Sequence, residues 1–377
     1  MTMNSSIAIV GAGLGGLVVA RLLLDAGYDV RVYEQAKMFT KLGAGIHLGP
    51  NLVKILQRLN VHHEIIREGY QPDAWTSRDG LSGDVLYRLP LRNTAQTVYG
   101  APYITAHRGS LHETLVKTVP PHYIEFDKRL VRLAESNDGV DLYFEDGSRA
   151  QADVVVGADG VNSKMREILI GEARPQFTGR VAYRGSALVS QLDFQLGDLT
   201  KWWGPNAHVM AYFVSPLRDE LFYIAVVSEK GWPHKSSFVE GDVTELRRLY
   251  NGFHPELQAV LAASPAVTKW AMFEQDPLPV WSRNRIVLLG DACHPMKPHM
   301  GQGAAMAMED AAVLARCLIQ DGVEHFDLAF KRYAHNRAPR ANDVQSESGK
   351  NRWLKEDTDP TWVFGYDALN TPLTLPI

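Results

Sequence analysis

Three glycines in G-x-G-x-x-G spacing, Gly11, Gly13 and Gly16, follow directly on an apolar run near the start of the chain. A helical pattern comes next, and a second apolar run, 30–33, ends at the acid Glu34. This order predicts a strand, a tight turn, a helix and a second strand, the plan of a dinucleotide-binding unit. The first glycine permits the turn, the second lets the backbone approach a pyrophosphate, and the third lets the helix pack close to the strand.

The helix that begins at this turn offers unpaired N–H groups and a partial positive charge to phosphates, and Gly15 lies among those groups. Glu34 is placed to accept hydrogen bonds from the adenosine ribose, with Gln35 beside it. Glycines alone mark many turns, but glycines flanked by both strands and the acid indicate a bound adenine dinucleotide.

Composition restricts the class of protein. At 377 residues and 45% apolar, the chain is long enough for two domains and a sizeable core. Its net charge is −4 with Lys and Arg spread throughout, which argues against nucleic acid as a partner. No segment reads as a signal peptide or a membrane span, so we expect a cytoplasmic protein without a membrane partner. Cys293 and Cys317 form no disulfide framework, and one Cys beside His294 does not make a metal site, so no metal is expected.

The apolar runs predict an α/β protein with a Rossmann-like cofactor domain and a second, mixed β-sheet domain for a substrate. We expect the cofactor domain at 1–173, the substrate sheet at 174–277, a return to the cofactor domain at 278–350 and a C-terminal extension at 351–377. Within these bounds the pattern predicts an antiparallel meander at 120–152, strands at 181–189, 208–214 and 221–227, and helices at 243–250 and 303–321.

The chain carries one complete dinucleotide fingerprint. The later glycine–acid turns, Asp159–Gly160 and Gly290–Asp291, lack the G-x-G spacing. A reductase that binds both a flavin and a pyridine nucleotide in dedicated domains usually needs two fingerprints. One dinucleotide is therefore held permanently, which favours FAD over NAD as the resident cofactor, and any second nucleotide binds elsewhere.

The segment around the second of these turns supports FAD. Asp291 follows a core-type strand, where a carboxylate can accept hydrogen bonds from the hydroxyls of a ribityl chain. Beyond Pro298, Gly301 and Gly303 open a helix whose free N–H groups stabilise negative charge on a reduced flavin ring. Arg108, just ahead of another helix, is placed to reach a pyrophosphate. The alternative readings are a capping Asp and a surface ion pair.

Together these motifs resemble those of the single-component, class A flavoprotein aromatic hydroxylases, over nearly the whole chain. The motifs are the glycine fingerprint with Glu34, the Asp159–Gly160 motif, and Gly290–Asp291 with His294–Pro295. The resemblance implies a GR2/PHBH-type fold in which Asp159 contributes to FAD binding. It also implies that NADH reduces FAD, that reduced FAD traps O2 as a C4a-hydroperoxide, and that the distal oxygen attacks an electron-rich ring carbon.

Within the family, the closest likeness is to members that act on 6-hydroxynicotinate, carried by residues 42–47, 201–203, 208, 212, 288–299 and 362–366. For that small aromatic carboxylate the resemblance implies loss of CO2 and 2,5-dihydroxypyridine as product. Salicylate-type and other hydroxyaryl carboxylates are the alternative substrates. The chain departs from this pattern at Leu199, where the resemblance implies a Cys that hydrogen-bonds toward a strand histidine.

The implied chemistry needs a closed, largely apolar site, because water destroys the hydroperoxide, and a base with a pKa near 7 for the ring hydroxyl. The candidates are His47, His208, Tyr212 and His299. The even spacing of His208 and Tyr212 on one predicted strand places both on the same face, where we expect substrate contacts. The resemblance places His47 near the flavin ring and His299 just before the flavin-facing helix.

Other interpretations remain open at this point. Trp202 and Trp203 either line the pocket or pack in the core. A flavin oxidase or dehydrogenase that inserts no oxygen and a non-catalytic carrier are the alternative functions. NADH is expected to dock transiently opposite the flavin, and the protein to be a monomer or homodimer.

Overall fold

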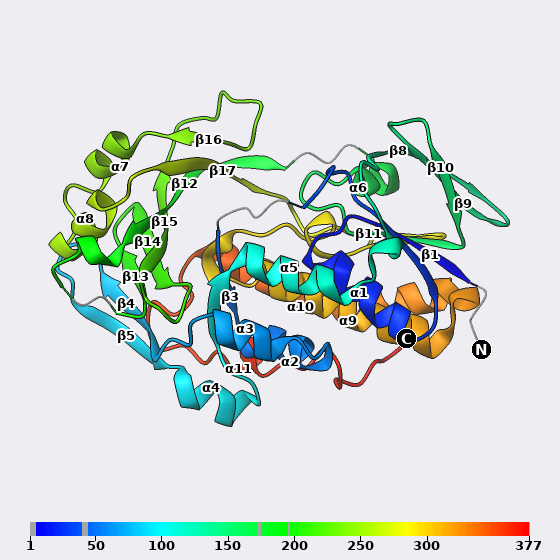
Figure 1. The fold of residues 1–377 in the computed structure, drawn as a ribbon, viewed down its shortest axis with the longest axis horizontal. Coiled ribbons are helices and arrows are strands. Elements are labelled where there is room, and N and C mark those ends of the chain that lie inside the picture. Colours follow the sequence, from blue (N-terminus) through cyan, green and yellow to red (C-terminus); the bar gives the residue numbers. More distant parts are fainter. Residues whose placement is uncertain (1–4, 40–43, 172–174, 195–196, 377) are drawn as a thin grey trace.

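The computed structural model describes residues 5–39, 44–171, 175–194 and 197–376 (Figure 1). Within these ranges a largely parallel six-stranded sheet has the order β18-β19-β11-β1-β2-β7. Its strands are β1 (Ser6–Val10), β2 (Asp29–Tyr33), β7 (Ile124–Glu125), β11 (Val154–Gly157), β18 (Ser282–Arg283) and β19 (Ile286–Leu288). The strand β1 is buried along nearly its whole length, as expected for a continuous apolar run inside a parallel sheet.

Helices cover this sheet, and α9 (Gly303–Asp321) lies among three of them. The helix α9 packs against α1 (Leu14–Asp25), α2 (Pro50–Arg58) and α10 (Phe326–Lys350). Because α9 is buried on most sides, its sequence is rich in Ala, Met and Leu. The helix predicted at 303–321 is confirmed, and the expected α/β fold is confirmed with it. The remaining helices are α3 (His62–Glu68), α4 (Arg92–Tyr99), α5 (Arg108–Thr118), α6 (Lys164–Ile170), α7 (Val243–Leu249), α8 (Pro255–Ala262) and α11 (Thr361–Phe364).

A second, eight-stranded sheet lies at the other end of the molecule, with the order β16-β17-β12-β15-β14-β13-β4-β5 (Figure 1). It is mixed, as predicted, because β13 and β4 run parallel while the other neighbours are antiparallel. Its strands are β4 (Ala74–Asp79), β5 (Val85–Pro90), β12 (Gln176–Leu188), β13 (Leu199–Trp203), β14 (Ala207–Phe213), β15 (Glu220–Ser228), β16 (Phe238–Gly241) and β17 (Val267–Glu274). The early strands β4 and β5 join this sheet, which the sequence analysis does not predict.

The two faces of this second sheet have different neighbours. Alternate residues of β13, β14 and β15 form an apolar cluster with Leu246 and Tyr250 of α7 and its turn, and with Leu257 of α8. The residues between them face the first sheet's side of the molecule and border a cavity. The period-2 alternation of a strand thus assigns one set of side chains to the core and the other to a site.

Two smaller units complete the fold. The expected meander is confirmed as β8 (Leu130–Ser136), β9 (Gly139–Phe144) and β10 (Arg149–Ala152), paired antiparallel. A two-stranded ribbon of β3 (Gly45–Leu48) and β6 (Ile104–His107) lies beside the cavity. No helix in the described ranges is both long enough and apolar enough to span a bilayer.

Candidate functional site

Two adjoining cavities form one elongated trough. The inner cavity, about 350 Å³, lies between the N-termini of α1 and α9, the strand β3 and the eight-stranded sheet. The outer cavity, about 630 Å³, lies against Glu34 and the end of β11. Both are bordered by Gly13, Ala158 and Gly160, so the glycine turn lies where they meet. A molecule with two ends joined by a narrow linker fits such a trough.

In the glycine turn, the fold itself requires glycine at positions 11 and 16 but not at position 13. Gly11 has φ +106°, and a Cβ there would lie 2.4 Å from the Ala158 carbonyl oxygen. A Cβ on Gly16 would lie 2.0 Å from the Gly11 carbonyl oxygen, so the close approach of α1 to β1 demands glycine. Gly13 differs, because its φ of −72° suits any residue and a Cβ would meet nothing within 4 Å. The space over Gly13 therefore fits a group that the protein itself does not supply.

The outer cavity contains the predicted ribose-binding residues. Glu34 and Gln35 both border it, together with Gly11. The Glu34 carboxylate accepts hydrogen bonds from the backbone N–H of Ala12 at 2.9 Å and of Ala36 at 2.8 Å. These bonds fix the carboxylate at the end of β2, and each oxygen keeps a further lone pair for a ligand hydroxyl.

Asp159 also borders the outer cavity and has a second, structural task. It accepts hydrogen bonds from Ser163 Oγ at 2.5 Å and from the Met165 backbone N–H at 3.0 Å, which fixes the start of α6. The buried Arg166 donates to the carbonyl oxygens of Val161 at 2.6 Å and Ala292 at 3.2 Å. Arg166 thus connects the two glycine–acid turns. Sequence reasoning missed it, although a lone Arg within the apolar pattern of 164–170 was the available signal.

The inner cavity is lined by the remaining predicted cofactor residues: Gly15, Gly16, Arg108, Asp291, Pro298, Gly301 and Gly303. The first turn of α9 is not capped by a side chain, and its N-cap residue Gln302 keeps Nε2 without a partner in the described structure. Gly301 has φ +67°, and a Cβ there would lie 3.1 Å from His47 Cβ. These open N–H donors fit the electron-rich edge of a flavin ring.

The four predicted substrate residues come together on the wall of the inner cavity. His47 Nδ1 is 2.8 Å from Tyr103 Oη, and the rings of His47 and Tyr212 meet edge to face at 4.2 Å. The rings of His208 and His299 also meet edge to face, at 5.0 Å. As predicted, the alternation of β14 turns His208 and Tyr212 to the same side. Of the predicted turn at 43–45 beside His47, Gly43 lies outside the described residues.

Burial keeps these groups uncharged. Burial, aided by the charge of Lys201, lowers the pKa of His47 to about 3 and that of His299 to about 2. Burial also lowers the pKa of His208 well below its ordinary value and raises that of Tyr212. Tyr212 Oη and His299 Nδ1 are buried and find no partner among the described residues. Since buried polar atoms are nearly always bonded, both fit a site that a polar ligand completes.

These lowered pKa values predict acid sensitivity of the apoprotein. A histidine that is neutral when folded and has a pKa of about 6.5 when unfolded lets the unfolded state bind more protons below that pH. The free energy of unfolding should therefore fall from pH 6.5 to 5.5 by about 1 kcal/mol for each such histidine. In denaturant titrations His47→Asn should reduce this loss by about that amount, and exposed His234→Asn should not. Equal losses in both variants would contradict the prediction.

Five side chains were missed or left open by the sequence analysis. Lys201 and Arg184 line the inner cavity and were missed, because a Lys or Arg in a strand pattern is usually solvated. Trp202 points to the opposite face of the sheet, where it packs in the apolar cluster that β13–β15 form with α7 and α8, called the α7–α8 cluster below. It therefore does not line the cavity. Trp203 borders a neighbouring pocket, with Lys201 Nζ 3.8 Å from its ring centroid. Leu199, at the position of the expected Cys, is fully buried and pairs with Tyr212 across the strands.

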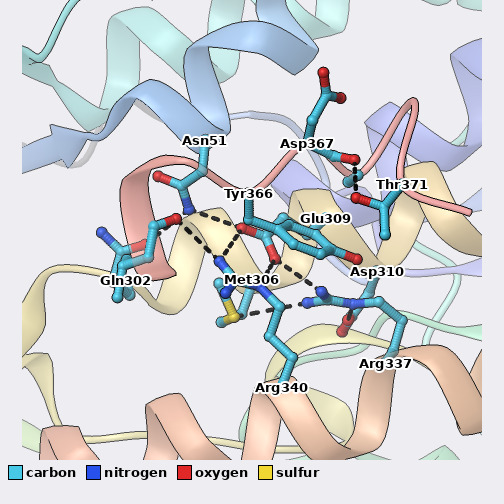
Figure 2. Close-up of polar contacts among 12 residues, drawn as sticks. Asn51, Gln302, Met306, Glu309, Asp310, Arg337, Arg340, Tyr366, Asp367 and Thr371 are labelled. Atoms are coloured by element: carbon cyan, nitrogen blue, oxygen red, sulfur yellow. Dashed lines mark hydrogen bonds and ion pairs between the residues drawn. The ribbon is translucent and has the colours of Figure 1, made fainter. Parts of the chain in front are cut away.

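A buried ion network supports the start of α9 (Figure 2). Arg337 of α10 donates to Glu309 and Asp310 of α9 at 2.8 Å each, and all three side chains are fully buried. Arg340, one turn further along α10, bonds Glu309 at 2.8 Å. Asn51 of α2 donates to the same carboxylate at 2.7 Å. Three helices are thus joined by charge-assisted bonds to two carboxylates that are fully buried.

The network reaches the cavity wall through two contacts. Asp310 accepts from the Gly290 backbone N–H at 3.0 Å and contacts His294 Nε2 at 2.5 Å, which fixes the turn that carries Asp291. Burial opposes ionisation of Asp310, but His294 and Arg337 outweigh it and lower its pKa to about 2. Asn51 also donates to Gln302 Oε1 at 3.0 Å, directly ahead of α9. His294 therefore stabilises the turn that carries Asp291.

Comparison with known proteins supports the dinucleotide site that the geometry indicates. Residues 4–348 match the family model described as FAD binding domain. Two relatives named 6-hydroxynicotinate 3-monooxygenase are similar to the chain: that of Bordetella bronchiseptica is 49% identical over 97% of this chain and 96% of its own, and that of Pseudomonas fluorescens is 47% identical over 100% and 98%.

Two solved structures are similar to this chain in fold. A salicylate hydroxylase substrate complex has a TM-score of 0.84 at 26% identity and covers 97% of this chain and 96% of its own. Klebsiella pneumoniae HpxO complexed with FAD and uric acid has a TM-score of 0.83 at 27% identity and covers 96% and 91%.

Proposed function

Since the chain belongs to the FAD-binding-domain family and is a FAD-dependent aromatic monooxygenase, we propose that it uses NADH and O2 to convert 6-hydroxynicotinate to 2,5-dihydroxypyridine. The balanced reaction consumes the acid, NADH, H⁺ and O2 and gives the hydroxylated ring, CO2, NAD⁺ and water. Bound FAD supplies the transfer of two electrons from NADH and the delivery of one oxygen atom to the ring. A salicylate-type acid is the alternative substrate.

The wall of the inner cavity is the observation that carries this proposal. It combines apolar side chains, Met210, Phe222, Ile224 and Val226, with a buried phenol, three buried imidazoles and a buried ammonium group. The apolar part suits a planar ring and excludes water, which protects an oxygen-activating flavin from wasteful peroxide release. The polar groups suit a ring that carries an oxygen and a carboxylate.

We assign roles to the chain's own residues accordingly. Gly13, Arg108 and the N-terminus of α1 hold the pyrophosphate, and Glu34 with Gln35 holds the ribose. Asp291 holds the ribityl chain, and Pro298, Gly301, Gly303 and the N-terminus of α9 face the flavin ring. The segments 1–173 and 278–350 form the FAD domain in this proposal, and 174–277 supplies most of the substrate sheet.

Tyr212 and His47 are assigned to the oxygen of the substrate ring. Tyr212 Oη lacks a partner among the described residues and can donate to that oxygen. His47 Nε2 accepts a hydrogen bond from the ring hydroxyl in the tautomer whose Nδ1–H donates to Tyr103 Oη. The His47 pKa of about 3 makes it a hydrogen-bond partner rather than the expected base with a pKa near 7. His208 and His299, at the far end of the cavity wall, orient the carboxylate as neutral hydrogen-bonding groups. NADH docks transiently in the cleft opposite the flavin.

A substrate panel tests the reaction. Purified holoenzyme is supplied with hydroxypyridine and hydroxybenzoate carboxylates while NADH loss, O2 uptake and released CO2 are followed. We expect 6-hydroxynicotinate to give the strongest stimulation of NADH oxidation, with one O2 and one CO2 per NADH. An oxidase or dehydrogenase would show no oxygenated product. If 6-hydroxynicotinate neither stimulates NADH loss nor releases CO2, the proposed substrate is wrong.

A matched pair of tyrosine variants tests the role of Tyr212. Tyr212→Phe removes the hydroxyl that faces the cavity and should lower kcat/KM about 10-fold to 30-fold, which corresponds to about 1.4–2 kcal/mol. Tyr223→Phe is the control, because Tyr223 Oη is also buried without a partner but belongs to the α7–α8 cluster. Equal kinetic losses in the two variants would remove Tyr212 from the substrate site.

A further inference from the structure

Lys201 is a buried cation without an anionic partner. It extends from the cavity face of β13 and is 1% exposed. Its Nζ donates a 3.0 Å hydrogen bond to Asn351 Oδ1 and lies over the Trp203 ring. No carboxylate in the described part of the chain forms an ion pair with it. A buried ammonium group is costly unless an opposite charge accompanies it.

The surroundings leave that charge uncompensated. Charge on Lys201 lowers the pKa of His47, His208 and His299, so all three lie near it and stay neutral. Burial in turn lowers the pKa of Lys201 itself. The empty site therefore favours loss of the lysine proton, and an anion bound in the cavity would favour keeping it.

We propose that Lys201 is the counter-ion of the substrate carboxylate, and that this ion pair makes the cavity selective for aromatic acids over neutral rings. The assignment rests on the function proposed above and deepens it. A carboxylate is ionised near neutral pH, whereas a ring hydroxyl is not, so the carboxylate is the group that Lys201 attracts. Arrival of the acid completes the charge, and the low polarity of the closed cavity strengthens the attraction.

Other cations line the inner cavity, and the structure distinguishes them from Lys201. Lys297 has a carboxylate of its own, Glu274 at 2.5 Å. Arg184 lies 4.4 Å over the Trp270 ring; burial lowers its pKa and its Nε has no partner in the described structure, but its side chain is more exposed than that of Lys201. Arg108 begins α5 and is the residue assigned above to the pyrophosphate. Lys201 therefore gains most from an incoming anion.

Asn351 is the positioning residue in this arrangement. It follows α10 in the left-handed conformation, φ 48°, and its side chain joins Lys201 to His208 Nδ1 at 3.2 Å. It also borders a neighbouring polar pocket of about 290 Å³ that shares His208 and His299 with the inner cavity. That pocket is lined by the cations Arg180, Lys297, Lys350 and Lys355, so the surroundings of this wall also attract anions.

Ligand titrations of the holoenzyme test the proposal, read from the change in flavin absorbance. The two probes are 6-hydroxynicotinate and its neutral amide, 6-hydroxynicotinamide. We expect the wild type to prefer the acid. Lys201→Met should weaken binding of the acid about 10-fold to 100-fold and that of the amide less than about threefold. Lys201→Arg should retain part of the preference, since it keeps the charge.

Two further variants separate an ion pair from a packing role. Asn351→Asp is nearly isosteric and places a carboxylate at the lysine, so it should remove the preference for the acid while leaving flavin content unchanged. Lys355→Met, at the exposed edge of the neighbouring pocket, should keep the preference. Equal weakening of both probes by Lys201→Met, or loss of the preference in Arg184→Met instead, would overturn the assignment.

Turnover is scored separately from binding. A wild type that prefers the acid but does not hydroxylate it contradicts the proposed function and leaves the ion pair standing. A wild type that hydroxylates the acid yet binds the amide equally well overturns the role of Lys201 and leaves the function standing.

Discussion

Replacing Arg337 by Met should destabilise the protein by about 3–5 kcal/mol and lower its Tm by about 4–6 °C. The reason is that Glu309 and Asp310 are fully buried and each loses a 2.8 Å ion pair while keeping its negative charge. Arg340 still contacts Glu309 in the variant, but Asp310 keeps only His294 and a backbone N–H. Removing one partner of a buried network costs more than the network contributes, because an uncompensated charge is left behind.

Chemical denaturation followed by circular dichroism measures this loss. Arg352→Met is the matched control, since Arg352 pairs with Glu347 at 3.1 Å with its side chain 63% exposed. Exposed pairs contribute less than about 1 kcal/mol, so the control should unfold nearly like the wild type. A loss below about 1 kcal/mol in Arg337→Met would mean that water or rearrangement compensates the two acids.

Replacing Gly13 by Glu should abolish FAD retention without harming the apoprotein. The backbone of Gly13 is ordinary extended chain, and a Cβ there meets no protein atom within 4 Å, so the fold tolerates a side chain. The new carboxylate fills the junction of the two cavities and repels a pyrophosphate. We expect FAD affinity to fall at least about 100-fold, which corresponds to about 2.7 kcal/mol.

Flavin content after purification and FAD titration of the apoprotein measure this effect. Gly231→Glu is the control, since Gly231 is exposed and a Cβ there also meets nothing. FAD should raise the Tm of the wild type and of the control but not that of Gly13→Glu. A Gly13→Glu protein that retains its flavin would show that the pyrophosphate does not pass over this residue.

The sequence predicts the features that depend on neighbours along the chain. The turn at Gly11–Gly16 and the helix that begins at Gly303 follow from local sterics and helix propensity, and both lie where expected. The shared face of His208 and Tyr212 follows from strand alternation alone. These predictions require no knowledge of which distant segments pack together.

The features that sequence reasoning missed depend on distant partners. The same alternation that placed Tyr212 also turns Trp202 away from Lys201, but the inward face of β13 is unknown until its partners are known. The roles of Arg166 and Arg337 depend on loops and helices far along the chain. In sequence these residues look like solvated charges, because nothing nearby reveals that they are buried.

The order of strands in the six-stranded sheet also bears on how the protein is made. β1, at the start of the chain, pairs with β11, and β11 pairs with β19 at Ile286–Leu288. The helix that packs on α1 begins only at Gly303, and its own support ends at Lys350. A ribosome must therefore synthesise the chain through β11 before β1 has both of its neighbours, and through α9 before α1 is covered. Incomplete translation products would expose unpaired sheet edges to chaperones and proteases. The coenzyme can bind its complete site only after α9 has been synthesised.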